Sequence, residues 1–495
     1  MDEYTLLELS WRKGAKNVIC HLLAPRKTIS LIEVEETRSY MVAIDGSVRY
    51  CFTGNPNIMD ADSQYVILTD RTPTKQKLLE GTVRQKRWLR HPQMVDHTPE
   101  DVLSSWTNQF SYKEEVDEDH PGLRRPQLGA LHAILGHFLS PTDVATVVLP
   151  TGTGKTETML SAMVVGKCKK LLVTVPSSAL RNQMYGKFKN LGVLKDPKFE
   201  IVGDDALYPI VGVVNTAFET AEELNAFIAQ CNVVITTMQI IDSAPQDQQD
   251  VYVSAFTNVF VDEAHHIVAT SWRKFADRFP KNRLIQFTAT PFRNDGQRLE
   301  GKIIFNYQLK QAQEDGYYRT IKFLPIREYD DEKADRAIAV RAIEQLRADL
   351  EAGHHHILMA RCESKPRARA VYSIYQEICP DLNPVIIYSD HPQYKENYEI
   401  ILRREAKVVV CVNMLGEGFD LPELKIAAFH DIRKSLPVTL QFAGRFTRTS
   451  RDADLGNASF VANLADITVQ QELDNLYEED ADWNVFTLCS PEHRK

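Results

Sequence analysis

Two short stretches of the sequence combine residue types that could act together on a phosphate group. Residues 152–156 read GTGKT and residues 262–266 read DEAHH, and each stretch follows a short apolar run. Glycines let backbone N–H groups surround a phosphate, and a lysine can reach the phosphate oxygens. A carboxylate beside them can hold a metal ion or accept a proton. Together the two stretches predict a nucleotide site.

The first stretch, within LPTGTGKTET, predicts a phosphate-binding loop between a strand and a helix. Lys155 would reach the β- and γ-phosphates of ATP, and the Thr156 hydroxyl would bind Mg²⁺. The first glycine of the pattern GxxxxGK[ST] is replaced by Leu149, but the remaining TGTGKT fits. A glycine-rich turn without a ligand is the alternative. The predicted ATP-binding residues of this loop are Thr151, Gly152, Thr153, Gly154, Lys155 and Thr156.

The second stretch supplies the carboxylates that a phosphate loop needs on a neighbouring strand. Asp262 would hold the Mg²⁺, and Glu263 would act as the base that activates water. A zinc site would need ligands at helical spacing, as in HExxH, and Glu263-x-His265 lacks that spacing. A buried structural Asp–His pair is the remaining alternative. The phosphate loop upstream favours the nucleotide interpretation.

Apolar runs along the chain indicate the elements that position these residues. From about residue 144 onward, β-rich runs alternate with helical or loop segments. Near-continuous apolar strands alternating with helices predict parallel sheets covered on both faces. One series ends at residues 150, 176, 237, 261 and 290, and the second at 360, 390, 413, 431 and 464. Two series predict two such domains.

The rest of the chain differs from these two series. Its first part contains short strand-like runs around an Asp45-Gly46 turn, which predicts a small β-containing module. The charge-rich segment Gln313–Ala337 would connect the two domains, irregular at its start and then helical over Asp331–Leu350. The predicted organisation is an accessory module at 1–118, a first domain at 119–318, a second domain at 319–480, and a tail at 481–495.

Composition sets limits on the class of protein. The 495 residues are 43% hydrophobic and 25% charged with a net charge of −9, which is ordinary for a globular protein and argues against a uniformly basic coat. The eight cysteines form no CxxC pair, so they predict neither a zinc finger nor a redox dithiol. The acidic N-terminus does not resemble a secretion signal, and no apolar run approaches a membrane span. We expect a soluble, cytoplasmic protein with no membrane partner.

Further motifs, in their order along the chain, resemble those of superfamily 2 helicases and translocases of the DEAH/DExH kind, over about residues 120–470. RRPQ resembles the adenine-contacting segment, and VPSSALRNQ and ITTMQ resemble the first two strand-contacting motifs. TAT at 288–290 is similar to the element that couples hydrolysis to domain movement. MLGEGFDLP and QFAGRFTR resemble motif V of DNA-directed members and the arginine-finger motif. The overall look is closest to type III restriction-like and phage-defence DNA helicases.

The resemblance implies an α/β fold with two tandem RecA-like doubly wound parallel-sheet domains beside the small N-terminal β-containing module. It adds Gln127, Gly418 and Asp420 to the nucleotide site, and it implies that His265 couples Glu263 to the second domain. The residues carried over to the arginine-finger motif are Gln441, Arg445 and Arg448.

An independent physical argument supports the two arginines. Phosphoryl transfer accumulates charge on the γ-oxygens, which an arginine from a second domain can stabilise. Arg445 and Arg448 are three residues apart, so on a helix they share one face. A surface basic pair is the alternative.

Nucleic acid is expected to cross the tops of both sheets, held mainly by backbone contacts and hydroxyls. The candidate contacts are Ser177, Ser178, Arg181, Thr236, Thr237 and Arg361. In the N-terminal module, basic residues of Lys75–Gln93 surround Trp88, which could stack on a base, although a solvated basic helix face is the favoured interpretation. The histidines at 354–356 predict a solvent-facing turn rather than a metal site.

These motifs predict an ATP-dependent motor on nucleic acid, most simply DNA, that uses ATP and Mg²⁺. A partner nuclease or defence-system subunit and a role in antiviral defence are further expectations. Three alternatives share parts of the pattern. An RNA helicase would have the same ATPase residues, a motor subunit could move along duplex DNA for a partner nuclease without separating strands, and a non-catalytic scaffold would only bind nucleic acid.

Overall fold

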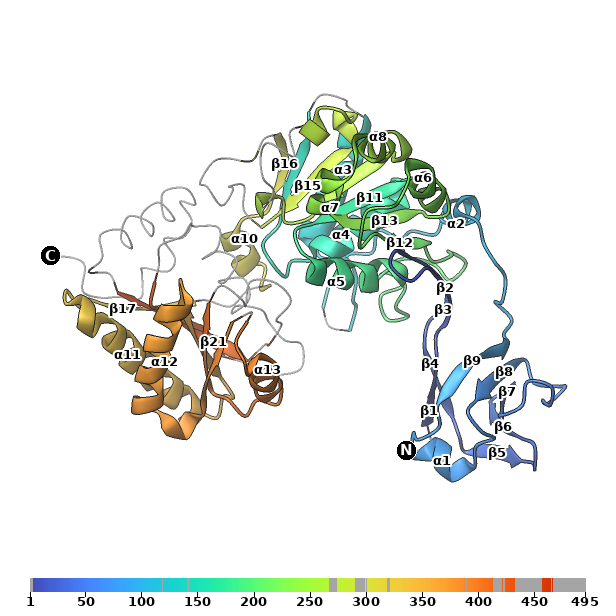
Figure 1. The fold of residues 1–495 in the computed structure, drawn as a ribbon, viewed down its shortest axis with the longest axis horizontal. Coiled ribbons are helices and arrows are strands. Elements are labelled where there is room, and N and C mark those ends of the chain that lie inside the picture. Colours follow the sequence, from blue (N-terminus) through green and yellow to red (C-terminus); the bar gives the residue numbers. More distant parts are fainter. Residues whose placement is uncertain are drawn as a thin grey trace. The chain divides into compact units, whose positions relative to one another are not determined.

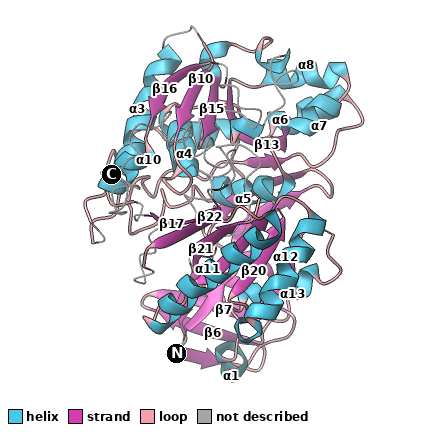
Figure 2. Cartoon of the chain, turned by 90° about the vertical axis from the view of Figure 1, so that its left-hand side faces the viewer, coloured by secondary structure: helices cyan, strands magenta, loops and turns pink. Residues whose placement is uncertain are grey.

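The computed structural model describes residues 3–117, 119–139, 143–266, 274–289, 299, 301–317, 321–388, 390–412, 421, 423–431, 456–463 and 465. Two large parallel sheets and a smaller N-terminal β module account for these residues (Figure 1, Figure 2). All ten apolar runs of the two series form strands in the large sheets, as predicted. Seven cysteines in these ranges are buried and free, so they act as small apolar side chains.

The first large sheet has nine strands in the order β16-β10-β15-β14-β11-β13-β12-β3-β2. Its core strands carry uninterrupted buried residues because both faces are covered by helices (Figure 1). The parallel strands are β10 (Ala145–Val148), β11 (Leu171–Val175), β12 (Val211–Val213), β13 (Val233–Thr237), β14 (Asn258–Val261), β15 (Leu284–Thr288) and β16 (Lys302–Asn306). The helices of this part are α3 (Arg125–Leu139), α4 (Lys155–Val165), α5 (Ser178–Lys189), α6 (Ala221–Ala229), α7 (Met238–Ser243), α8 (Gln246–Ala255) and α10 (Leu309–Glu314).

Two strands from the start of the chain complete this sheet. β3 (Val18–Ala24) pairs antiparallel with β12, and β2 (Leu9–Lys13) pairs antiparallel with β3 and forms the outer strand. The first large sheet therefore draws its last two strands from residues that precede the phosphate loop by more than one hundred positions.

The remaining N-terminal residues form their own sheets and core. A five-stranded sheet has the order β5 (Glu33–Glu36), β6 (Tyr40–Asp45), β7 (Val48–Thr53), β8 (Tyr65–Thr69) and β9 (Gln85–Arg90). β1 (Glu3–Leu6) pairs with β4 (Lys27–Ser30). The Asp45-Gly46 turn joins β6 to β7 with a positive φ of 62° at Gly46, as predicted. Two short helices, α1 (Lys75–Leu79) and α2 (Pro99–Ser105), follow.

The predicted basic helix face around Trp88 is wrong. Most of this stretch is α1 and β9 rather than one helix, and the Trp88 ring is 7% exposed within the module's core. Its Nε1 donates to the carbonyl of Leu7 at 3.2 Å. Trp88 is therefore a core residue in this structure and does not offer its face for stacking on a base.

The second large sheet is parallel throughout, in the order β17-β22-β21-β18-β20-β19. α11 (Asp331–Glu351) and α12 (Lys365–Ile378) pack side by side on it and share one apolar core with its strands (Figure 1). The predicted helix after Asp331 is confirmed, but the connector before it contains a strand, β17, rather than only irregular chain. The other elements are β17 (Ile321–Ile326), β18 (Ile357–Cys362), β19 (Pro384–Ile387), β20 (Val408–Val412), β21 (Leu424–Phe429), β22 (Ala458–Asn463) and α13 (Tyr394–Leu402).

Candidate functional site

The phosphate loop lies between β10 and α4, as predicted from its sequence. Gly152 and Gly154 have φ values of 93° and 97°, a region that favours glycine. The loop is closed by the Thr153 hydroxyl, which donates to the carbonyl of Pro150 at 2.8 Å. α4 begins at Lys155, so the N–H groups of its first turn face the loop and provide an anion-binding helix start.

The first turn of α3 is packed directly on this loop. A Cβ added to Gly154 would lie 1.8 Å from Nε2 of Gln127, so this amide rests against the loop backbone. The Gln127 Oε1 accepts a hydrogen bond from the N–H of Arg124 at 2.7 Å, and the Arg124 Nη1 donates to the carbonyl of Gly152 at 2.9 Å. The segment that the resemblance assigns to adenine therefore shares one network with the phosphate loop.

The acidic stretch meets the loop through an ion pair. The Lys155 Nζ lies 2.8 Å from Oε1 of Glu263, and their side chains are 9% and 15% exposed. Glu263 holds a φ of 47°, a conformation that costs a non-glycine residue roughly 1–3 kcal/mol and often marks functional sites. Residues 108 positions apart in sequence are thus brought together as the nucleotide interpretation requires.

Asp262 and Thr156 carry the kind of oxygen ligand that Mg²⁺ prefers, and their proposed role at the metal stays a prediction. Asp262 is 4% exposed directly after β14, and its N–H donates to the carbonyl of Thr174 in β11 at 2.9 Å. Thr156 is the second residue of α4. Mg²⁺ prefers oxygen ligands and commonly takes one or two carboxylates together with phosphate oxygens, whose charge it neutralises. Within the described ranges, no three His, Cys, Asp or Glu side chains gather into a metal-binding group.

His265 connects the acidic stretch to the end of β15. Its Nδ1 lies 3.0 Å from the Thr288 hydroxyl and 3.6 Å from Oε2 of Glu263, and the residue is 2% exposed. The imidazole therefore lies between Glu263 and Thr288, the first threonine of the TAT motif. A movement of Glu263 or of Thr288 would therefore displace the His265 ring and, through it, the other residue.

The predicted nucleic-acid contacts of the first large sheet differ in accessibility. Ser178 is exposed at the start of α5, whereas Ser177 is half-buried. Thr237 is 7% exposed at the end of β13, and Arg181 is 8% exposed. The Thr236 hydroxyl is fully buried and donates to the carbonyl of Val214 at 3.2 Å. Ser178 offers an open side chain here, while a contact through Thr236 would involve its backbone or a rearrangement.

Both candidate arginines are buried. Burial lowers the pKa of Arg181 and of Arg361 below the usual arginine value. Arg361 is 4% exposed at the end of β18, and its Nη1 donates to the carbonyl of Asp431 at 3.3 Å. In this structure Arg361 supports the end of β21, and a phosphate contact by it stays a prediction.

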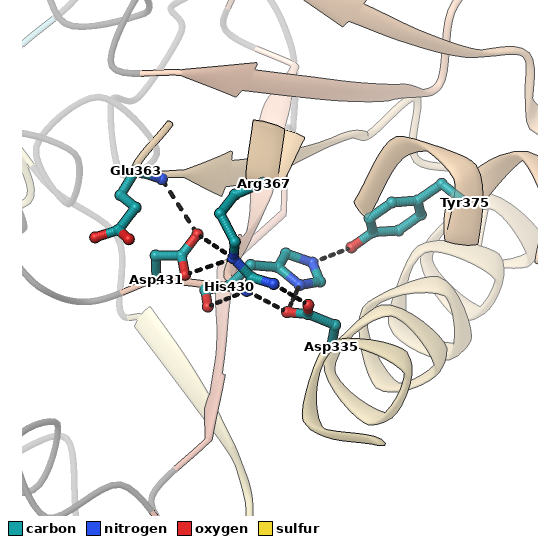
Figure 3. Close-up of polar contacts among 6 residues, drawn as sticks. All are labelled: Asp335, Glu363, Arg367, Tyr375, His430 and Asp431. Atoms are coloured by element: carbon teal, nitrogen blue, oxygen red, sulfur yellow. Dashed lines mark hydrogen bonds and ion pairs between the residues drawn. The ribbon is translucent and has the colours of Figure 1, made fainter. Parts of the chain in front are cut away.

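A polar cluster in the second large sheet was not predicted from the sequence (Figure 3). Arg367 on α12 donates to both oxygens of Asp335 on α11, at 2.7 and 2.9 Å, and its Nε lies 3.0 Å from Oδ1 of Asp431. His430 Nδ1 lies 2.9 Å from Asp335 Oδ1, and His430 Nε2 lies 3.1 Å from the Tyr375 hydroxyl. The cluster ties α11 and α12 to the chain that leaves β21.

The cluster holds its carboxylate charged. Burial raises the pKa of Asp335, but the hydrogen bonds and charges of His430 and Arg367 outweigh it and leave the pKa lower than usual. The chain continues from Asp431 toward the arginine-finger motif. A histidine and an acid at the carboxyl end of a predicted strand were the available signal, but their partners lie 55 to 95 residues away.

The histidine turn before β18 is only partly as predicted. His355 is exposed, but His356 is 1% exposed and its Nδ1 lies 2.7 Å from Oδ2 of Asp349. The rings of His354 and His356 are stacked at 4.9 Å. The solvent-facing interpretation is therefore wrong for His356, which is a buried, paired histidine of the fold.

Several predicted site residues lie outside the described residues, and their positions stay predictions. They are Gln441, Arg445 and Arg448 of the arginine-finger motif and Gly418 and Asp420 of motif V. In the part of the chain that the structure describes, no helix is both long enough and apolar enough to cross a bilayer.

Comparison with known proteins shows that this chain is similar to restriction-enzyme subunits, helicases and translocases. Residues 120–293 match the family model of the type III restriction enzyme, res subunit. "Putative helicase 22" of Sulfolobus islandicus filamentous virus is 22% identical over 377 residues, covering 68% of this chain and 64% of the viral protein. "DNA 3'-5' translocase XPB2" of Sulfurisphaera tokodaii is 23% identical over 361 residues, covering 62% of this chain and 75% of that protein. The chain thus spans about two thirds of the viral relative's length.

A solved structure supports the fold class. "The fragment structure of a putative HsdR subunit of a type I restriction enzyme from Vibrio vulnificus YJ016" covers 97% of this chain and 90% of its own, with a TM-score of 0.54 and 15% identity. At that identity the likeness concerns the fold alone. It confirms an α/β chain with two RecA-like parallel-sheet domains.

Proposed function

From its place among superfamily 2 helicases with restriction-like similarity, we propose that this chain is an ATP-dependent DNA translocase or helicase that works with Mg²⁺. The observation that carries the proposal is the 2.8 Å ion pair between Lys155 of the phosphate loop and Glu263. In this proposal Lys155 would hold the triphosphate and Glu263 would activate water, and the ion pair brings these two side chains into contact. The restriction-type and translocase relatives favour DNA over RNA.

The site suggests how binding prepares hydrolysis. A triphosphate takes Lys155 as its own counter-charge, so binding ends the Lys155–Glu263 pair and leaves the carboxylate available to accept a proton from water. His265 then keeps Glu263 in contact with Thr288. Arg445 and Arg448, from the second domain, stabilise charge on the γ-oxygens, and the alternation of bound and free states moves the protein along a strand.

One experiment tests the proposal. ATP turnover is measured with single-stranded, duplex and forked DNA and with RNA of matched sequence, for the parent and for Glu263→Gln. We expect DNA to stimulate the parent several-fold over RNA, and the variant to lose at least about 100-fold in turnover while still binding ATP. A parent stimulated only by RNA would favour the RNA helicase. A parent that binds DNA without any turnover would favour the scaffold.

A translocating subunit without strand separation is a second candidate, favoured by the match to a restriction-enzyme subunit. It would displace a protein block from duplex DNA but leave a forked duplex paired. We infer a cytoplasmic role in antiviral defence beside a partner nuclease, because restriction-enzyme subunits match this chain both in a family model and in fold. Loss of protection against phage in the Glu263→Gln strain would support that setting.

A further inference from the structure

The hairpin formed by β2 and β3 concentrates positive charge in an acidic protein. Residues 9–24 contain three Lys or Arg residues and no Asp or Glu, whereas the whole chain has a net charge of −9. Arg12, Lys13 and Lys16 lie at or near the tip and are exposed. Arg12 pairs with Glu8 at 3.0 Å, but no ion pair of Lys13 or Lys16 is found within the described residues. The tip therefore presents uncompensated charge to solvent.

The tip has a fixed conformation and a fixed attachment. Gly14 holds a φ of 96°, and a Cβ there would lie 1.9 Å from the carbonyl oxygen of Asn17, so the turn requires glycine. The Asn17 Oδ1 accepts from the N–H groups of Asn215 and Thr216 at 2.8 and 3.1 Å, and its Nδ2 donates to the carbonyl of Thr216 at 3.1 Å. Asn215 donates back to the carbonyl of Lys16. A pre-organised tip loses less entropy on binding.

This attachment places the tip at the carboxyl edge of the first large sheet. Val213 pairs with Val18 across β12 and β3, and with Ile235 across β12 and β13 (Figure 1). The next residue, Val214, accepts the hydroxyl of Thr236 at 3.2 Å. Adjacent strands are about 4.8 Å apart, so the hairpin lies roughly 10–15 Å from β13 along the edge where nucleic acid is expected to cross.

Trp11 adds an aromatic surface to the same hairpin. It lies on β2, the outer strand of the sheet, opposite His21, and is 38% exposed. An exposed indole beside lysines is the combination that single-stranded nucleic acid uses for stacking and phosphate contacts. Trp88, the alternative stacking residue that the sequence offered, is buried, whereas Trp11 is exposed.

We propose that the β2–β3 hairpin, residues 9–24, is an additional DNA-binding element that holds a single strand as it leaves β13, with Lys13 and Lys16 on phosphates and Trp11 against a base. The inference rests on the proposed function. The positive charge of the tip favours a polyanion such as DNA as the bound partner. Pairing of the free edge of β2 with a strand of a partner protein is the competing use of this surface, and the test below separates the two.

The test compares two double variants of equal charge change. In Lys13→Glu/Lys16→Glu the proposed phosphate contacts are reversed, and in Lys77→Glu/Lys395→Glu two exposed lysines of other elements are reversed. Affinity for a fluorescent single-stranded DNA is measured by anisotropy from about 0.05 to 0.3 M salt. Two lost phosphate contacts lower the salt slope by about 1.4 and the affinity by about 25-fold at 0.1 M salt. The control variant should change both quantities far less.

Two further measurements keep the inference apart from the function on which it rests. ATP turnover without DNA should match the parent in both variants, which shows that they fold. Trp11→Ala should weaken binding roughly 5- to 150-fold with an unchanged salt slope, because stacking carries no counterion term. If the parent binds no DNA, the proposed function fails. If the parent binds DNA and the Lys13→Glu/Lys16→Glu variant matches the control, the hairpin is not a DNA contact and the edge-pairing alternative gains support.

Discussion

At the scale of single residues, the site depends on close contact between an amide and a glycine. Gly154 combines a positive φ with a neighbouring amide 1.8 Å from any added Cβ. Gly154→Ala would strain the loop and displace Gln127. Both the backbone that would bind the phosphates and the amide that the resemblance assigns to adenine would then be out of position. We expect the affinity for ATP to fall at least about 10-fold, measured by titration with a fluorescent ATP analogue.

Gly136→Ala is the matched control for this substitution. Gly136 lies in α3 with nothing within 4 Å of an added Cβ. The same change there should leave ATP affinity intact and stabilise the helix by about 0.5–1 kcal/mol. Equal ATP affinity in the Gly154→Ala variant and the parent would mean that the loop does not hold the triphosphate in the observed conformation.

At the scale of elements, the polar cluster of the second sheet should act as a fixed anchor for the chain leaving β21 (Figure 3). Arg367→Ala leaves Asp335 and Asp431 without their common partner. Breaking a buried pair costs about 3–5 kcal/mol, and we expect roughly 2–3 here because Arg367 is 37% exposed. Hydrogen exchange in β21 and α12, measured by mass spectrometry, should then be about 30- to 150-fold faster.

Arg336→Ala provides the control, because Arg336 makes a similar two-pronged pair with Glu377 on the same helices but at the surface. Their side chains are 51% and 63% exposed, so the loss should stay below about 1 kcal/mol. Equal hydrogen exchange in the Arg367→Ala and Arg336→Ala variants would mean that the cluster does not stabilise β21 and α12.

The stability that the cluster contributes should also depend on pH, because the pKa of Asp335 is lower in the folded state than in the unfolded chain. This contribution to the free energy of unfolding is complete above the unfolded pKa of about 3.9 and is lost as the pH falls below it.

The apolar pattern of the sequence predicted the strands whose burial is visible in their own residues. The strands β10, β11, β13 and β14 were predictable because both of their faces are buried and each reads as an apolar run. The strand β16 was not, since its residues are half-exposed or exposed. Sequence order also gave no sign that β2 and β3 close the edge of a sheet whose other strands begin at Ala145.

The same limit applies to the site. The loop at 152–156 and the acids at 262–263 were predictable because each motif is contiguous. Their ion pair joins the ends of β10 and β14, which are separated in the sheet by β15. Trp88 and His356 were misjudged because their partners, Leu7 and Asp349, are set by tertiary packing that no local pattern contains. The cluster around Arg367 was missed for the same reason, as its three elements are brought together only by the sheet.

At the scale of the whole molecule, the proposal divides the reaction between two sheets. Every described residue that we propose for the nucleotide site, from Gln127 to Thr288, belongs to the first sheet and its helices, so we expect this half to bind ATP by itself. The predicted arginine-finger motif lies in the sequence between β21 and β22 of the second sheet. An interaction made only when charge develops on the γ-oxygens lowers the barrier without adding to ground-state affinity. Binding and turnover should thus respond differently to changes in the two sheets.

Arg445→Ala tests that division. We expect the rate of turnover with DNA present to fall about 10³-fold, with the dissociation constant for ATP within about 3-fold of the parent, because the finger acts on the transition state. Lys155→Ala should instead lose ATP binding outright, since the phosphates then face Glu263 without a counter-charge. If Arg445→Ala weakens ATP binding as much as Lys155→Ala does, Arg445 contributes to binding ATP in the ground state. The second domain would then take part in ATP binding as well as in hydrolysis.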